Sequence, residues 1–171
     1  MTDPFVHLHN HSEYSMLDGF SRLGDMVNRA VELEQPAIAL TDHGGLHGAI
    51  EFYQKATKAG ITPIIGVEGY VADGPRDERN PQKRSPFHMT VLAQNRVGYQ
   101  NLLKLVTASH LEGFYYRPRM DREILEKYSE GLIVLSGCPS GELARYIKNG
   151  DMDAAHETLE WYGNVFQDRY Y

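Results

Sequence analysis

Short apolar runs alternate along the chain with stretches of helical periodicity. In Arg22–Glu34, apolar residues recur at the spacings of one helix face. Ala37–Leu40 is apolar throughout, which is typical of a strand buried on both faces. Further strands are predicted at Phe5–His11, within Ile61–Val71, at Phe87–Ala93 and at Leu132–Ser136, and further helices at Leu46–Lys58, Gly98–His110, Gly141–Lys148 and Met152–Phe166.

This alternation predicts an α/β fold with a largely parallel sheet, either open or closed into a barrel. One connection departs from it, because residues 72–86 are rich in Gly, Pro, Asp and Arg and show no helical pattern. The strands that flank this loop are therefore expected to be antiparallel. Asp168–Tyr171 is typical of entry into another strand.

Length and charge narrow the function classes. The 171 residues, with 17 Lys and Arg against 23 Asp and Glu, fit one globular domain of net charge −6. This balance argues against binding nucleic acid through bulk positive charge, but it leaves open a nucleic-acid substrate held through metal ions. The single Cys excludes a disulfide framework, and no secretory signal or membrane-spanning run is present. We therefore expect a cytoplasmic protein.

Three histidines, His7, His9 and His11, fall on alternate positions near the N-terminus. In an extended segment they share a face, but residues 7 and 11 would be about 13 Å apart at roughly 3.3 Å per residue. One ion cannot bind all three, whereas a neighbouring pair can share a cluster. Other residues typical of metal sites stand close to predicted strand ends: Asp42, His43, Glu68, His88 and Cys138. Such ends are where α/β folds place their sites.

Several strings in sequential order resemble the PHP (polymerase and histidinol phosphatase) domain, and more narrowly the form found at the N-terminus of bacterial replicative DNA polymerases. They are Phe5–Gly19, Ala39–Gly44, Pro63–Glu68, Leu111–Tyr115 and Gly131–Cys138. The resemblance covers essentially the whole chain. It implies a distorted (βα)₇ barrel of the TIM type that binds two to three divalent ions at one end.

The resemblance also implies a ligand set. The corresponding residues here are His9, His11, Asp18, His43, Glu68, His88 and Cys138. His7 precedes the ligand pair and is expected to have a supporting role. The family's later Asp-x-His pair is absent from residues 1–171, so we expect this chain to be the N-terminal portion of the domain, incomplete at its C-terminus. A mixture of imidazole, carboxylate and thiolate suits Zn²⁺, Mn²⁺ or Fe²⁺ better than Ca²⁺ or Mg²⁺.

The implied activity is metal-dependent phosphodiester hydrolysis, removing nucleotides from a DNA 3′ end in proofreading. In that mechanism His9, His11 and Glu68 act through a metal-activated water. Arg117 and Arg119 are candidate contacts for the substrate phosphate. The expected partners are DNA and the remainder of a polymerase chain. Two alternatives stay open: a non-catalytic module that stabilises the polymerase and docks a separate exonuclease subunit, and a phosphomonoesterase of the histidinol-phosphate type.

Overall fold

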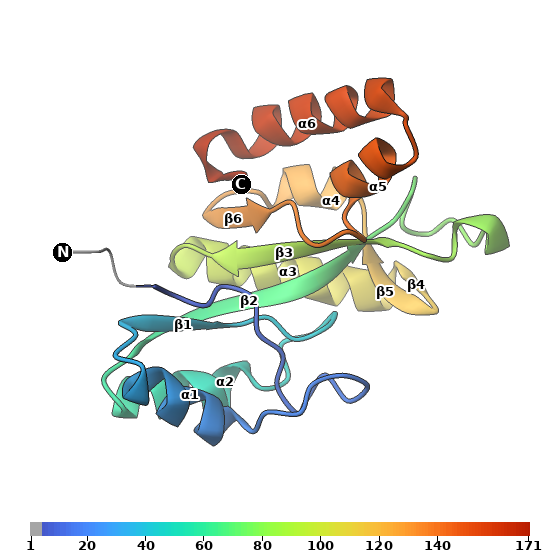
Figure 1. The fold of residues 1–171 in the computed structure, drawn as a ribbon. Coiled ribbons are helices and arrows are strands. Elements are labelled where there is room, and N and C mark those ends of the chain that lie inside the picture. Colours follow the sequence, from blue (N-terminus) through green and yellow to red (C-terminus); the bar gives the residue numbers. More distant parts are fainter. Residues whose placement is uncertain (1–4) are drawn as a thin grey trace.

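A computed structural model describes residues 5–171, which form a mixed sheet with helices around it (Figure 1). The strands are β1 (Ala37–Leu40), β2 (Thr62–Val71), β3 (Phe87–Ala93), β4 (Phe114–Tyr115), β5 (Arg117–Met120) and β6 (Leu132–Leu135). The helices are α1 (Leu23–Glu32), α2 (Ala49–Lys58), α3 (Arg96–Leu111), α4 (Arg122–Lys127), α5 (Glu142–Lys148) and α6 (Met152–Phe166), with 3₁₀ turns at Pro81–Lys83 and Gln167–Arg169.

The long strand β2 organises the sheet. Its first half pairs with β1 in parallel, and its second half pairs with β3 antiparallel and with β5 in parallel. The order is β4-β5-β2-β3-β6, with β1 attached to β2 outside this path. The antiparallel step across residues 72–86 is confirmed. The prediction of a largely parallel sheet is wrong, because β3–β6 and β4–β5 are antiparallel as well.

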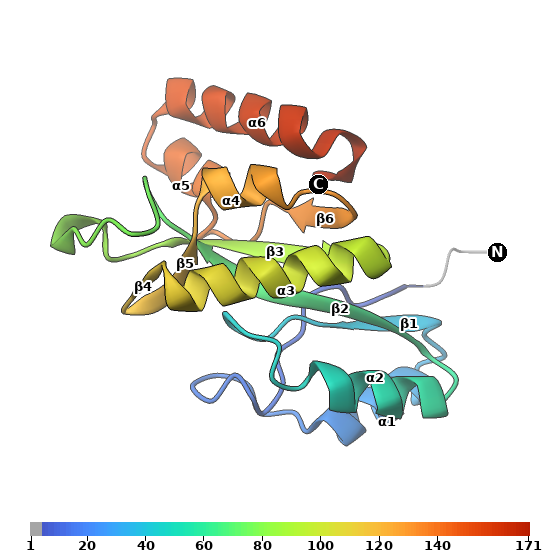
Figure 2. The same ribbon diagram turned by 180° about the vertical axis from the view of Figure 1, so that it is seen from behind.

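Helices cover the sheet at several places. Helices α1 and α2 pack together beside β1 and β2, while α5 and α6 lie beyond β6 (Figure 1). Helix α3 runs along one face of the sheet, and Figure 2 shows it from that side. The main core lies between this face and α3, where Val67 and Val91 meet Leu102 and Leu105. A smaller core lies between α1, α2 and β1.

The described strands form an open sheet, so the expected (βα)₇ barrel is not confirmed. Strands β4 and β5 and helix α4 were missed by the sequence pattern. Arg117–Met120 contains two arginines and a proline, and therefore lacks the apolar alternation of a strand. The last residues do approach the sheet edge, since Tyr170 forms a bridge to Val134 in β6.

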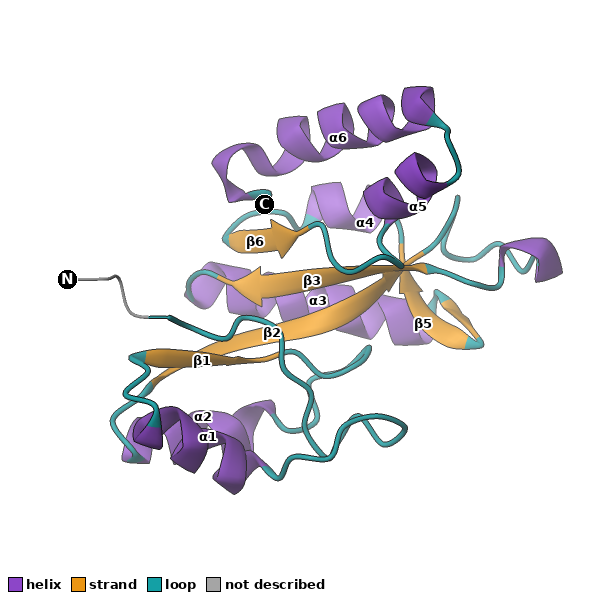
Figure 3. Ribbon diagram, viewed as in Figure 1, coloured by secondary structure: helices purple, strands orange, loops and turns teal. Residues whose placement is uncertain are grey.

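The predicted strand Phe5–His11 is wrong, because this segment is an extended loop beside β1 (Figure 3). Among residues 5–171, main-chain bonds reach it only at His7 and Asn10, whose carbonyls accept from Ala39 and Thr41. The side chain of Asn10 donates to the carbonyls of His7 and Ala39, and its main-chain N–H donates to Oγ1 of Thr41. Side-chain bonds thus replace the regular ladder. No helix within residues 5–171 is long and apolar enough to cross a membrane.

Candidate metal centre

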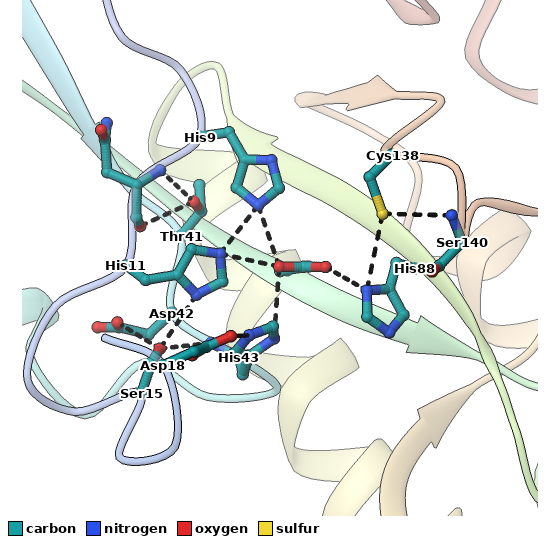
Figure 4. A network of polar contacts seen from close by, with 12 residues as sticks. His9, His11, Ser15, Asp18, Thr41, Asp42, His43, His88, Cys138 and Ser140 are labelled. Carbon is teal, nitrogen blue, oxygen red and sulfur yellow. Dashed lines mark hydrogen bonds and ion pairs between the residues drawn. The ribbon is translucent and has the colours of Figure 1, made fainter. Parts of the chain in front are cut away.

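Glu68 is a buried carboxylate whose oxygens face four histidines. Figure 4 shows these histidines, His9, His11, His43 and His88, gathered around one place. Successive strand residues face opposite sides of a sheet, and Val67 and Val71 point into the core against α3. Glu68 and Tyr70 therefore face the other side of the sheet. His88 in β3 faces this side as well, because it lies opposite Tyr70 in the β2–β3 pair. Only 3% of the Glu68 surface is exposed. A carboxylate buried to this degree needs partners of opposite charge or hydrogen-bond donors.

The extended segment beside β1 brings His9 and His11 to Glu68. Nε2 of His9 lies 3.0 Å from Oε2 of Glu68, and Nε2 of His11 lies 2.9 Å from the same oxygen. The two Nε2 atoms are themselves 3.0 Å apart. Two imidazole nitrogens and one carboxylate oxygen thus converge on one small region.

The loop after β1 contributes His43, whose Nδ1 lies 3.3 Å from Oε2 of Glu68. Its other nitrogen, Nε2, lies 2.8 Å from Oδ2 of Asp18 in the 12–21 loop. Gly44 turns the chain directly afterwards at φ +61°, a conformation that disfavours residues with a Cβ. The Gly44 N–H donates to the carbonyl of Glu68, which fixes the loop against β2.

His88 and Cys138 approach Glu68 from the opposite side. Nδ1 of His88 lies 2.5 Å from Oε1 of Glu68, and Sγ of Cys138 lies 3.9 Å from the same nitrogen. The thiol follows β6, where the N–H of Ser140 donates to Sγ at 3.4 Å. Because β3 runs antiparallel to β2, the start of β3 meets the end of β2 at this place.

The histidines control the electrostatics of the site. Burial alone would raise the pKa of Glu68, but hydrogen bonds from His11, His88 and His9 outweigh it and hold this pKa far below its usual range. The hydrogen bond to Glu68 raises the pKa of His11, and the contact with His43 lowers the pKa of Asp18. The protein thus keeps negative charge at the centre of a ring of nitrogens.

The donor atoms suit divalent cations. Three groups of donors each lie within 4.8 Å of one another: His9, His11 and Glu68; His11, Asp18 and His43; and Glu68, His88 and Cys138. Within residues 5–171, Nδ1 of His43 is buried and makes no hydrogen bond. An orphaned buried nitrogen that faces a carboxylate fits a place where a cation would supply the missing charge. The structure therefore brings all seven predicted ligands together.

The other residues singled out in the sequence lie elsewhere. His7 is exposed and packs edge-on against Phe5. Arg117 is exposed beside a cleft of about 500 Å³, which Asp18, His43 and His88 also line. Arg119 is buried, and its guanidinium donates to the carbonyls of Gly113, Arg76 and Glu78. The prediction of a phosphate contact at Arg119 is therefore wrong, since its N–H groups serve main-chain carbonyls.

The sequence placed Asp42 among the candidate site residues, but it did not predict the contacts that support the ligands. Asp42 is buried and accepts bonds from Ser12 and Ser15, which fold the 12–21 loop over it. Gly19 is required in this loop, because a Cβ there would lie 1.8 Å from the Ser12 carbonyl oxygen. His110 of α3 is exposed, and its Nε2 contacts the carbonyl of Gly44 at 2.8 Å. The available signal for Asp42 was its position next to His43 at the end of an apolar strand.

Comparison with known proteins agrees with this geometry. Residues 7–171 match the PHP domain, and the chain belongs to this family. It is 47% identical over 169 residues to the DNA polymerase III subunit alpha of Borreliella burgdorferi, and 46% identical over 172 residues to that of Thermus aquaticus. These matches cover 98% of the chain but only 15% and 14% of the two relatives. The chain is thus similar to a small part of a replicative polymerase subunit.

One solved structure shares the fold. An amidohydrolase from Chromobacterium violaceum aligns with a TM-score of 0.52, over 93% of this chain and 83% of its own. Its sequence identity of 15% supports a common fold alone.

Proposed function

We propose that this chain is the PHP domain of a bacterial DNA polymerase III alpha subunit and that it hydrolyses phosphodiester bonds at a DNA 3′ end. One observation carries the proposal: nitrogens from four histidines converge on one buried carboxylate, that of Glu68. An ion pair that only stabilises the fold needs one partner for this acid, whereas here four imidazoles face it. The proposed location, beside DNA in the cytoplasm, follows from the same activity.

The seven residues would hold two to three divalent ions, with Zn²⁺, Mn²⁺ or Fe²⁺ suited to the nitrogen, oxygen and sulfur donors. Ions bound there would supply Lewis acidity, which activates water and neutralises charge on a phosphodiester. Glu68 is placed to be shared, since its two oxygens face His88 on one side and His9 and His11 on the other. The barrel of the family stays a prediction for this chain.

The chain's own residues form a substrate cleft beside this centre. Arg84 and Arg117 both line it, and each guanidinium can donate to a phosphate oxygen. The guanidinium of Arg117 lies 5.5 Å from the centroid of the Tyr70 ring, which orients it toward the cleft. The ring of Tyr70 stacks in turn on His43, at 5.9 Å between centroids. The ring of Tyr70 therefore contacts both Arg117, the candidate phosphate contact, and His43, a candidate ligand.

A DNA-degradation assay tests the proposal. A 5′-labelled strand should be shortened from its 3′ end in the presence of Mn²⁺ or Zn²⁺, and the double variant His9→Ala, His11→Ala should abolish this. His156→Ala is the matched control, because it removes an exposed histidine of α6 outside the site. Degradation by the double variant at the rate of the unmodified protein would contradict the proposal. Faster cleavage of a small phosphate monoester than of DNA would favour a phosphomonoesterase instead.

A second candidate function is a docking module for a separate proofreading exonuclease. The 12–21 loop favours it, because Met16, Leu17 and Phe20 are 87%, 85% and 100% exposed, and Leu17 lines the cleft. Large apolar side chains grouped in this way are typical of a surface covered by a partner. Metal binding without any DNA degradation would support the module over the enzyme.

A further inference from the structure

The hydroxyl of Ser15 joins three separate segments of the candidate metal centre. Its Oγ lies 2.7 Å from Oδ1 of Asp42, 3.1 Å from the main-chain nitrogen of His43 and 3.3 Å from Nδ1 of His11 (Figure 4). Ser15 is buried, and so is Asp42. The hydroxyl therefore has to satisfy its hydrogen-bonding capacity within the protein.

Counting hydrogens assigns each of these bonds a direction. A serine hydroxyl has one hydrogen to donate and two lone pairs to accept with. An ionised carboxylate only accepts, so the Ser15 hydrogen goes to Asp42. The N–H of His43 can only donate, and it occupies one lone pair of Oγ. The remaining lone pair faces His11, and the contact is favourable only if Nδ1 of His11 carries a hydrogen.

We propose that Asp42 and Ser15 are positioning residues that hold His11 in the form with its hydrogen on Nδ1. Nε2, which lies 2.9 Å from Oε2 of Glu68 and 3.0 Å from Nε2 of His9, is then the nitrogen that could exchange its hydrogen for a cation. This is the form in which an imidazole binds a cation through Nε2. The inference deepens the proposed function and rests on it, because the cation would sit where His9, His11 and Glu68 converge.

Ser12 offers a comparison that separates this role from general support of the loop. Its hydroxyl donates to the other oxygen of the same carboxylate, Oδ2 of Asp42, at 2.7 Å. It is as deeply buried as Ser15. No contact joins its hydroxyl to His11 among residues 5–171. Removing either hydroxyl therefore deprives Asp42 of one donor, but only the loss of Ser15 frees Nδ1 of His11.

The first experiment measures Zn²⁺ affinity by competition with a chelator in Ser15→Ala, Ser12→Ala and the unmodified protein. Partners that orient metal-binding histidines typically change affinity by about 10- to 100-fold. We expect a loss in this range for Ser15→Ala and less than about threefold for Ser12→Ala, with both variants folded in thermal unfolding. Equal losses in the two variants, or unchanged affinity in Ser15→Ala, would overturn the proposal.

A second measurement needs neither metal nor a variant. Long-range ¹H–¹⁵N correlation spectra of the metal-free protein report which nitrogens of His11 carry a hydrogen. Nδ1 is expected to carry one, whether or not Nε2 also carries one toward Glu68, and an Nδ1 without a hydrogen would overturn the proposal. If the unmodified protein binds no Zn²⁺ while His11 carries its hydrogen on Nδ1, the proposed function fails and the positioning role stands.

Discussion

Two clusters of charge in this protein are built on opposite principles. Around Glu68, four histidines face one acid. Around Arg76, one guanidinium faces three acids, with Asp121 at 3.1 Å, Glu123 at 3.0 Å and Glu112 at 2.5 Å. Both clusters are partly buried, and both fix a loop against the sheet.

The two clusters differ in whether the hydrogens on their own side chains are enough to satisfy all their hydrogen-bonding groups. Burial would lower the pKa of Arg76, but its hydrogen bonds to Glu112, Glu123 and Asp121 raise it, so this cluster always has its donors. A neutral imidazole carries one hydrogen, and Nδ1 of His43 has no hydrogen-bond partner in residues 5–171. The arginine cluster is therefore complete in itself, whereas the cluster around Glu68 leaves a buried nitrogen that a cation would satisfy.

The largest expected effect comes from Glu68→Gln. It removes the charge shared by two of the three donor groups, and we expect Zn²⁺ affinity to fall by at least about 100-fold, or about 2.7 kcal/mol. Chelator competition measures this change. Glu112→Gln is the control, because it removes a carboxylate from the arginine cluster and should leave the affinity unchanged. Equal affinities in Glu68→Gln and the unmodified protein would contradict the comparison.

Arg119→Met tests the support of the arginine cluster, because Arg119 donates to the carbonyl of Arg76. Arg119 is buried, and of the three carbonyls that its guanidinium satisfies, those of Arg76 and Glu78 have no other donor within residues 5–171. Buried groups left unsatisfied cost about 1–3 kcal/mol, so we expect the free energy of unfolding in urea to fall by about 2 kcal/mol. Arg117→Met, two residues away on β5 but exposed, should change it by less than about 0.5 kcal/mol. Similar losses in both would show that burial is not the cause.

The same contrast explains what the sequence could predict. Apolar periodicity located β1, β3 and α6 well, and α6 has the predicted bounds. Ligand candidates were found because His, Asp, Glu and Cys near strand ends form a recognisable pattern. Supporting contacts such as those of Ser15 and Arg119 depend on segments far apart in sequence. No local pattern in residues 72–86 indicates that the carbonyls of Arg76 and Glu78 accept hydrogen bonds from Arg119.

A smaller effect should follow from adding the cation itself. A ligand that binds only the folded protein stabilises it by about 1.4 kcal/mol at ten times its Kd. Zn²⁺ should stabilise the unmodified protein and Arg119→Met by this same amount, since the two clusters are separate. Urea unfolding with and without Zn²⁺ measures it. A stabilisation that disappears in Arg119→Met would mean that the clusters are coupled.

The last prediction concerns high pH, away from both clusters. Burial, and then the charge of Glu142, raise the pKa of Tyr170 to about 12, against about 10 in the unfolded chain. As the pH rises, Tyr170 therefore loses its proton in the unfolded chain before it does so in the folded chain. The stabilisation that comes from this pKa difference is fully present below pH 10 and is lost as the pH rises toward 12. Tyr170→Phe should flatten the dependence of unfolding on pH in this window. A dependence that persists in full in this variant would assign it to another group.

Elemental analysis determines directly whether the cluster around Glu68 is a metal centre. The metal-free protein is dialysed against Zn²⁺ or Mn²⁺, and the ions retained per chain are counted beside those in the double variant His9→Ala, His11→Ala. We expect at least two ions per chain in the unmodified protein and fewer in the variant. Retention of no ion, or of equal numbers in both proteins, would contradict it.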